Sequence, residues 1–185
     1  MPLFTISEFS DFKYFLTFRI LSADLYSSFS DSCSSLVVKN SNSTQLSLSV
    51  GLHFGKSFFA SALDHQACTQ GYRVAYFNVQ KLLLKTKMSR IDGTVYKLFE
   101  KISRAELLIL DDFGLTHLEQ QQRMDMMEII EDRHASRATI IASQLPVSKW
   151  YDIIGENTIA DALLDRMVHT SYRIELKGES LRKKR

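Results

Sequence analysis

From about residue 46 onward, the sequence predicts an α/β domain with a mostly parallel sheet and helices on both faces. Segments with strand character alternate with amphipathic helical segments, at the spacing typical of parallel β–α units. The tripeptide Gly55-Lys56-Ser57 opens the first of these helices. The apolar run Leu107–Leu110 is typical of a strand buried on both faces, and two carboxylates follow it.

The expected elements follow from hydrophobic periodicity and local stop signals. A strand at Leu46–Val50 precedes the Gly55-Lys56-Ser57 helix, which Gly71 is well placed to end, and Pro146 ends a later unit. Five residues of the first helix, four of them apolar, fall on one face: Phe59, Ala62, Leu63, Gln66 and Ala67. A second stripe comprises Val95, Leu98, Phe99 and Ile102. The other expected strands are Arg73–Phe77, Leu107–Leu110, Thr139–Ala142 and Tyr172–Leu176, and the other helices are Val79–Lys87, Thr94–Ser103, Leu118–His134 and Thr158–Val168.

The N-terminal region has a different composition. Residues 1–50 contain no glycine, thirteen serines and six of the chain's twelve phenylalanines. We therefore divide the chain into a Ser/Phe-rich head, residues 1–45, and a domain at residues 46–185. Residues 8–29 are compatible with a helix, and Ser27–Ser35 reads as a loop. No function follows from the head, which is left unassigned as helical or disordered.

The composition is that of a globular protein, with 45% hydrophobic residues and a formal net charge of +2. From Arg173 to Arg185 there are six Lys/Arg against two Glu, so this end is basic, which fits either a solvated end or an acidic partner such as nucleic acid. Cys33 and Cys68 form no disulfide or metal pattern, which favours a reduced, cytoplasmic setting. No run approaches the roughly 20 apolar residues that span a bilayer, so we expect no membrane association.

The first motif with chemical meaning is Gly55-Lys56-Ser57. In a phosphate-binding loop, backbone N–H groups and the helix N-terminus hold an anionic phosphate, a lysine reaches the terminal phosphates, and a hydroxyl binds Mg²⁺. A chance tripeptide in an ordinary glycine-containing loop is the alternative. The candidate nucleotide-binding residues are Gly51, Gly55, Lys56, Ser57 and Phe58, with Ser57 also a candidate Mg²⁺ ligand.

The second motif is the strand Leu107–Leu110 followed by Asp111 and Asp112, about fifty residues after the first. Charges at the end of an apolar strand are costly unless they serve a purpose, and this end of a parallel strand faces the crevice where such folds bind ligands. Asp111 would hold Mg²⁺, and Asp112 would orient or activate the attacking water. A simple turn into Phe113-Gly114 is the alternative.

Further segments carry a family resemblance together with these motifs: Asp64–Cys68, Gln70–Tyr72, Leu107–Gly114, Glu131–Arg133, Ser143–Pro146, Leu164–Arg166 and Glu175–Ser180. They resemble the IstB-like ATP-binding proteins, the helper ATPases of bacterial transposons, which are related to the DnaC helicase loaders within the AAA+ class. The resemblance covers about 135 residues and includes loops as well as nucleotide motifs. Residues 1–45 do not share it.

The resemblance implies an AAA+ P-loop core whose C-terminal lid is largely absent, with ATP and Mg²⁺ as cofactors. Ser143 and Gln144 would form the sensor that contacts the γ-phosphate or the attacking water. Arg166 matches the arginine finger that reaches a neighbouring subunit, although an ordinary salt bridge on its helix is the alternative. The implied partners are DNA, a transposase and further copies of the chain. The candidate catalytic residues are thus Asp112, Ser143 and Arg166.

The phosphate loop departs from the full pattern G-x-x-x-x-G-K-[ST]. Val50 stands where the first glycine belongs, His53 replaces a second glycine of the family, and Gly51 lies one position late. A non-glycine residue forced into a glycine conformation costs about 1–3 kcal/mol. Either the loop is rebuilt around Gly51 and an ATPase remains, or the chain is a nucleotide-free scaffold or decayed remnant. A DnaC-like helicase loader is a third reading, which Gly178–Ser180 and the basic end disfavour.

Overall fold

The structure is a computed structural model that describes residues 3–6, 45–49, 56–169 and 171–176. These residues form one six-stranded sheet with the strand order β1-β6-β2-β5-β4-β3. Every pair of neighbouring strands is parallel. The strands are β1 (Leu3–Ile6), β2 (Gln45–Ser49), β3 (Val74–Asn78), β4 (Leu107–Phe113), β5 (Ala138–Ser143) and β6 (Ser171–Leu176).

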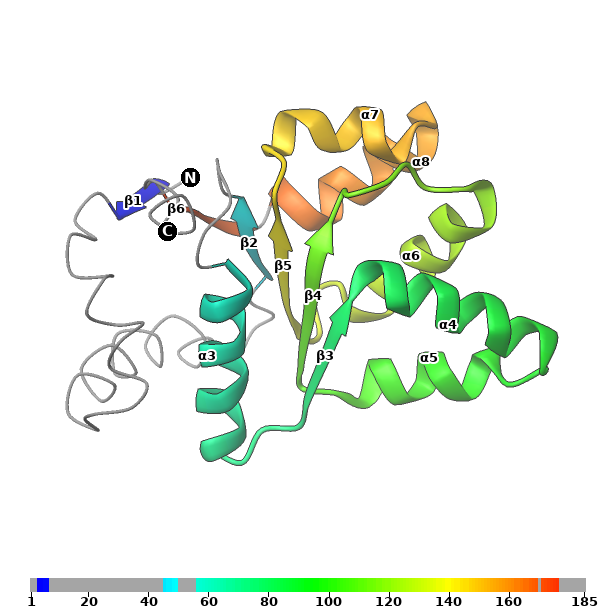
Figure 1. The fold of residues 1–185 in the computed structure, drawn as a ribbon, viewed down its shortest axis with the longest axis horizontal. Coiled ribbons are helices and arrows are strands. Elements are labelled where there is room, and N and C mark those ends of the chain that lie inside the picture. The colour runs from blue at the N-terminus through cyan, green and yellow to red at the C-terminus, as the bar shows by residue number, and fades with distance from the viewer. Residues whose placement is uncertain (1–2, 7–44, 50–55, 170, 177–185) are drawn as a thin grey trace, which may run out of the picture.

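The helices lie on both faces of this sheet, as the sequence predicted (Figure 1). The connection through α3 runs from β2 toward β3, whereas the later connections run back toward β6. Because such crossovers are right-handed, α3 lies on the opposite face from the helices of the later connections. The helices are α3 (Lys56–Thr69), α4 (Val79–Ile91), α5 (Val95–Arg104), α6 (Gln120–Arg133), α7 (Trp150–Ile154) and α8 (Asn157–Leu164), with short helices η2 (Val147–Lys149) and η3 (Asp165–His169).

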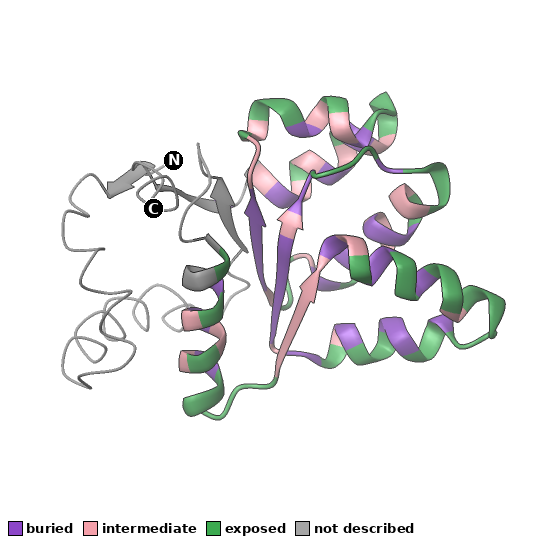
Figure 2. Cartoon of the chain, viewed as in Figure 1, coloured by how far each residue is buried: buried purple, intermediate pink, exposed green. Residues whose placement is uncertain are grey.

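The core lies around β4 and β5, the most continuously buried strands (Figure 2). Helices contribute one apolar face each, and the predicted stripe on α5 is confirmed as buried. Trp150 is fully buried and packs edge-to-face on Phe113 with ring centroids 4.8 Å apart. No helix among the described residues is long and apolar enough to cross a membrane.

Most expected elements are present, with some differences in their bounds and number. Gly71 ends α3 as predicted: its φ of 85° lies in the left-handed region, and the N–H of Tyr72 closes the helix on the carbonyl of Ala67. Helix α6 begins at Gln120 rather than at residue 118, because Glu119 and Gln122 form a capping box. The expected helix 158–168 is instead α8 followed by a π-helical turn, η3. Helix α7 was not predicted.

The N-terminal region contributes strand β1, which pairs in parallel with β6 at the edge of the sheet. The sequence did not predict this strand, because Leu3–Ile6 has no clear alternation and no flanking turn signal. The expected helix at 8–29 and loop at 27–35 lie outside the described residues. The division of the chain near residue 45 stays a prediction.

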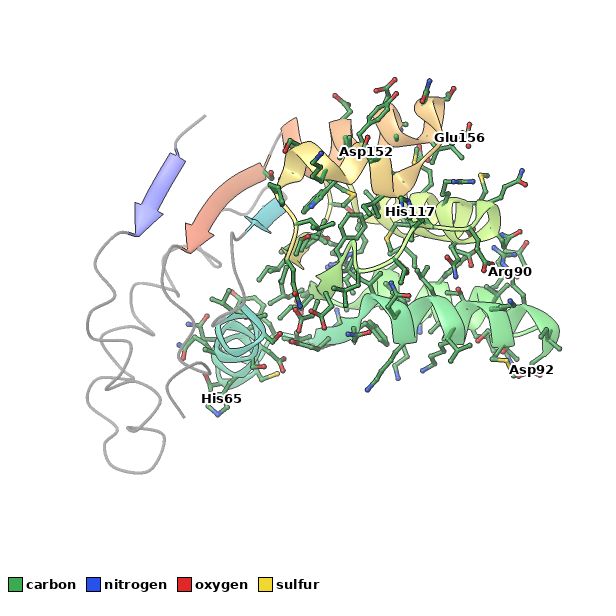
Figure 3. All side chains as sticks on the ribbon, turned by 45° about the horizontal axis from the view of Figure 1, so that its top comes forward. His65, Arg90, Asp92, His117, Asp152 and Glu156 are labelled. Atoms are coloured by element: carbon green, nitrogen blue, oxygen red, sulfur yellow. The ribbon has the colours of Figure 1, made fainter. Side chains whose placement is uncertain are left out.

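Two buried polar contacts brace the helical layer. Arg133 is 1% exposed and donates to the carbonyls of Ile102, Ala105 and Ala138 and to the hydroxyl of Thr139. Burial lowers the pKa of Arg133 to about 10, which leaves the side chain charged at neutral pH. Arg90 on α4, labelled in Figure 3, donates to the buried carboxylate of Asp125 on α6. These contacts fix α4, α5 and α6 relative to the sheet.

Candidate nucleotide and magnesium site

Asp111 lies at the carboxyl end of β4, at the sheet edge where β3 and β5 also end. Asp111 is buried, with 6% of its surface exposed. None of the ion pairs among the described residues involves it. The Tyr76 hydroxyl donates to Asp111 Oδ2 at 2.7 Å, and the Asp112 N–H donates to Asp111 Oδ1 at 2.9 Å. Neutral donors orient this carboxylate without supplying a counter-charge, so it can still attract a cation.

Asp112 occupies an unusual backbone conformation at an irregularity in the sheet. The register of β4 against β5 shifts between Leu110 and Phe113, and Asp112 has a φ of 59°. Aspartate and asparagine adopt this left-handed conformation more readily than other L-residues. The side chain is held from both neighbouring strands: Asn78 Nδ2 donates to Oδ2 at 2.9 Å, and Gln144 Nε2 donates to Oδ1 at 3.1 Å. At this irregularity, the Asp112 side chain therefore connects the end of β4 to the ends of β3 and β5.

The two residues of the expected sensor have different environments. Ser143 is fully buried, and its hydroxyl donates to the carbonyl of Phe113 at 2.7 Å. The same oxygen accepts from the N–H of Leu145 and from Trp150 Nε1, both at 3.1 Å. These three bonds use the hydroxyl proton and both lone pairs within the protein. The structure therefore brings Gln144 to the carboxylates and does not bring the Ser143 hydroxyl there.

The phosphate-loop side of the site is described only from α3 onward. Lys56 is the first residue of α3, and Ser57 is exposed in its first turn. Figure 1 shows that α3 starts at the side of the sheet toward which β4 and β5 point, so Ser57 and Asp111 belong to the same edge. Outside the described residues lie Val50, Gly51, His53 and Gly55, and the side chains of Lys56 and Phe58.

Arg166 lies in η3, directly after α8 in the chain, and its contacts with the described residues do not involve Asp111 or Asp112. Its guanidinium donates to the carbonyl of Ala162 at 3.0 Å and forms an ion pair with Glu131 at 3.2 Å. The Arg166 side chain is 25% exposed and that of Glu131 is 58% exposed. Within one chain Arg166 thus makes the salt bridge that the sequence left as an alternative, and its role toward a neighbouring subunit stays a prediction.

Sequence reasoning missed two residues of the site, Tyr76 and Asn78. Both lie on β3, which pairs in parallel with β4 so that Tyr76 is opposite Ile109 and Asn78 is opposite Asp111. The signal that could have found them is a polar residue at the end of the strand next to the Asp-Asp pair, because the carboxyl ends of neighbouring parallel strands meet. Without the strand order, the sequence did not show that these strands are neighbours.

The donor set at this edge fits Mg²⁺ bound together with a nucleotide. Mg²⁺ prefers oxygen ligands and is commonly held by one or two carboxylates plus substrate phosphates. Asp111, Asp112 and the exposed Ser57 are oxygen donors of this kind. No group of three His, Cys, Asp or Glu side chains able to hold a metal occurs among the described residues. A metal at this edge would therefore share its coordination with a bound phosphate.

The fold and the position of the site define an AAA+ P-loop ATPase architecture. Solved structures with the same arrangement include DnaI, with a TM-score of 0.70 and 18% identity over 85% of this chain and 87% of that chain. AMPPCP-bound DnaA from Aquifex aeolicus matches with a TM-score of 0.64 and 16% identity, over 86% of this chain and 46% of that chain. At these identities the likeness concerns the fold alone.

The chain belongs to the IstB-like ATP binding protein family, whose model matches residues 30–185. It is 50% identical to the insertion sequence ATP-binding protein y4pL of Sinorhizobium fredii over 129 residues, which is 70% of this chain and 53% of that protein. It is 45% identical over 94 residues to the IS1162 ATP-binding protein of Pseudomonas fluorescens, covering 51% of this chain and 41% of that protein. The chain spans about half the length of these relatives. The resemblance recognised from the motifs is confirmed, but the match begins at residue 30 and so includes residues 30–45, which we expected to lie outside it.

Proposed function

We propose that this chain binds ATP with Mg²⁺ and acts as an oligomerising helper ATPase in the transposition of an insertion sequence. The observation that carries the proposal is the pair Asp111 and Asp112 at the carboxyl end of β4, to which the described residues present neutral donors. The names of the relatives support the link to an insertion sequence. The ATP-binding description of the family supports the nucleotide.

In this proposal each residue has one task. Gly51, Gly55 and the first N–H groups of α3, up to Phe58, surround the phosphates, and Lys56 reaches the terminal ones. Ser57 and Asp111 hold Mg²⁺, which supplies charge stabilisation of the transferred phosphoryl group when bound. Asp112 orients the attacking water. Gln144 takes the sensor role that we expected of both Ser143 and Gln144, because its amide already reaches Asp112.

Arg166 completes the site of a neighbouring copy of the chain. Its ion pair with Glu131 is partly exposed, and exposed pairs contribute only about 0–1 kcal/mol, so assembly can replace this contact at small cost. A finger of this type is typically worth about 10³–10⁵ in rate. We expect Arg166→Ala to retain ATP binding and to lose hydrolysis, measured as phosphate release at concentrations where the wild-type chain assembles. Mixing Arg166→Ala with Lys56→Ala should restore part of the activity, since each variant supplies what the other lacks; equal activity of wild type and Arg166→Ala would exclude the finger.

DNA is the proposed nucleic-acid partner, and helices α4 and α5 offer a surface for it. Residues 79–104 carry seven Lys/Arg against two Asp/Glu, whereas the whole chain has a net charge of only +2. The seven cationic residues are all exposed: Lys81, Lys85, Lys87, Arg90, Lys97, Lys101 and Arg104. Such a surface attracts phosphate backbones by releasing their counterions.

The DNA proposal predicts a salt-dependent affinity that falls on charge reversal. Lys85→Glu combined with Lys87→Glu should weaken binding to duplex DNA at least tenfold and reduce the dependence of the affinity on salt, measured by fluorescence anisotropy. Lys149→Glu, an exposed lysine on η2, is the matched control and should bind almost as wild type does. Unchanged affinity of the double variant would exclude this surface.

Calorimetry with ATP and Mg²⁺ tests the central claim, with Lys56→Ala as the control variant. Binding of ATP by the wild type and its loss in Lys56→Ala support the proposal. Absence of heat from both proteins would instead favour the nucleotide-free scaffold suggested by Val50 and His53. Assistance to a transposase is then tested by adding the transposase and measuring whether ATP changes its association with DNA.

A further inference from the structure

The phenolic hydroxyl of Tyr76, on β3, points at the carboxylate of Asp111. The hydroxyl donates to Asp111 Oδ2 at 2.7 Å. Burial raises the pKa of Tyr76, the bond to Asp111 raises it further, and the side chain of Ser61 acts in the opposite direction. Ser61 lies on α3 one turn after Ser57, and its hydroxyl donates to the carbonyl of Ser57 at 2.7 Å. Tyr76 lies on β3, a strand that contacts both α3 and β4, the two elements that carry the proposed Mg²⁺ ligands.

A tyrosine is suited to orient the Asp111 carboxylate, because its hydroxyl does not neutralise the carboxylate's negative charge. A lysine or arginine at this position would pair with Asp111 and compete with a metal cation. A phenol donates one hydrogen bond and remains neutral, and each carboxylate oxygen has a second lone pair. Among the described residues, the Asp112 N–H is the donor to Oδ1 of Asp111 and the Tyr76 hydroxyl is the donor to Oδ2, which leaves an acceptor position on each oxygen for a ligand.

A purely structural role would be better served by an apolar side chain. Tyr76 lies on the edge strand β3 and is only partly buried, so a phenylalanine could fill the same volume without a buried polar contact. The hydroxyl adds nothing to packing, but it fixes the rotation of a carboxylate in a residue that is only 6% exposed. Partners that orient a metal ligand in this way typically change metal affinity about 10–100-fold when they are removed.

We propose that Tyr76 is a positioning residue that fixes the Asp111 carboxylate for Mg²⁺. The proposal rests on the proposed function, because it concerns the same site. Removing the hydroxyl should weaken metal binding in the nucleotide complex and leave binding of metal-free ATP unchanged. This separation of two affinities distinguishes positioning from a general effect on the fold.

The test uses the full chain and Mn²⁺ as a spectroscopic substitute for Mg²⁺. The affinity of the ATP-loaded protein for Mn²⁺ is measured by electron paramagnetic resonance, and that for ATP is measured in the presence of EDTA. We expect Tyr76→Phe to weaken Mn²⁺ binding about tenfold and to change metal-free ATP binding less than about twofold. Tyr72→Phe, a partly exposed tyrosine four residues earlier, is the matched control and should leave both affinities unchanged.

A double-variant cycle guards against an effect through folding. Tyr76→Phe is compared with Tyr76 in two backgrounds, one with Asp111 and one with Asp111→Asn. All four proteins are measured at a temperature below their thermal unfolding midpoints. Because Tyr76 acts through Asp111, Tyr76→Phe should reduce Mn²⁺ affinity only where Asp111 is present. An equal loss in both backgrounds, or an equal loss of Mn²⁺ and metal-free ATP binding, would overturn the positioning role.

The wild-type measurements separate this proposal from the proposed function. A wild-type chain that binds no ATP overturns the proposed function, and the role of Tyr76 with it. A wild-type chain that binds ATP and Mn²⁺, matched by Tyr76→Phe in both affinities, overturns only the role of Tyr76.

Discussion

Charged side chains that form no ion pair with the described residues lie near both ends of the central strands: Arg133 at one end, and Asp111 and Asp112 at the other. The two sites differ in the hydrogen bonds that these side chains make. Arg133 is buried near the amino end of β5, where three carbonyls and one hydroxyl accept its hydrogen bonds. Asp111 and Asp112 lie at the carboxyl end of β4, where hydroxyl and amide groups donate to them. None of the ion pairs among the described residues involves either group.

The difference lies in what remains available to a ligand. Arg133 binds the last carbonyls of α5, which carry the negative end of that helix dipole, and its donors are largely used within the protein. The two carboxylates receive few donors for their eight lone-pair positions and lie at the edge where a nucleotide would bind. A charge with its hydrogen bonds satisfied internally serves the fold, whereas one with free positions is suited to a ligand.

The largest expected effect is on stability, from Arg133→Met. The substitution removes four hydrogen bonds that a buried charged donor makes to Ile102, Ala105, Ala138 and Thr139, so we expect the free energy of unfolding to fall by about 3–5 kcal/mol. Urea denaturation measures this change. The exposed Arg137→Met should stay within about 0.5 kcal/mol of wild type. A loss below 1 kcal/mol for Arg133→Met would contradict the structural role.

The matching substitution at the other group, Asp112→Asn, should affect hydrolysis and spare the fold. Asparagine tolerates the left-handed backbone at position 112, and the charge that orients the attacking water is lost. We expect single-turnover phosphate release to slow by about 10²–10⁴-fold while the unfolding midpoint does not fall. Asp132→Asn, an exposed aspartate on α6, is the control. Hydrolysis at the wild-type rate would remove Asp112 from the mechanism.

The contrast can be sharpened at two adjacent residues, Ser143 and Gln144. Ser143→Ala removes the hydrogen bond from Trp150 Nε1 to the Ser143 hydroxyl and the bond from that hydroxyl to the Phe113 carbonyl. We therefore expect the free energy of unfolding to fall by about 1–3 kcal/mol and the rate of hydrolysis to be preserved. Gln144→Ala should have the opposite profile, with stability nearly unchanged and hydrolysis reduced about tenfold. The reverse assignment of these two effects would restore Ser143 as the sensor.

The smallest effect is expected from Glu131→Gln. This change removes the charge opposite Arg166, but Glu131 is 58% exposed and water screens the pair. The free energy of unfolding should therefore change by no more than about 0.5 kcal/mol. A loss above 2 kcal/mol would show that Arg166 is mainly a structural residue, and it would weaken the proposal that this side chain serves a neighbouring subunit.

How far the sequence predicted the site depends on how local each signal is. The strand ending in Asp111 and Asp112 and the helix opened by Lys56 and Ser57 were predicted because each is a continuous pattern. Tyr76 and Asn78 were missed because their importance arises from pairing between β3 and β4, whose order in the sheet no local pattern specifies. Helix α7 was missed because Trp150–Ile154 is shorter than two helical turns.

The sequence by itself determined the α/β class, the order of the strands from β2 to β6, and the identity of the two carboxylates as candidate ligands. Hydrophobic periodicity and the residues that start and stop helices act over a few positions, so they can be read without a structure. Only the tertiary structure decided which side chains hold those carboxylates. The bulge at Asp112, the amides of Asn78 and Gln144 and the hydroxyl of Tyr76 meet there because three parallel strands end at one edge.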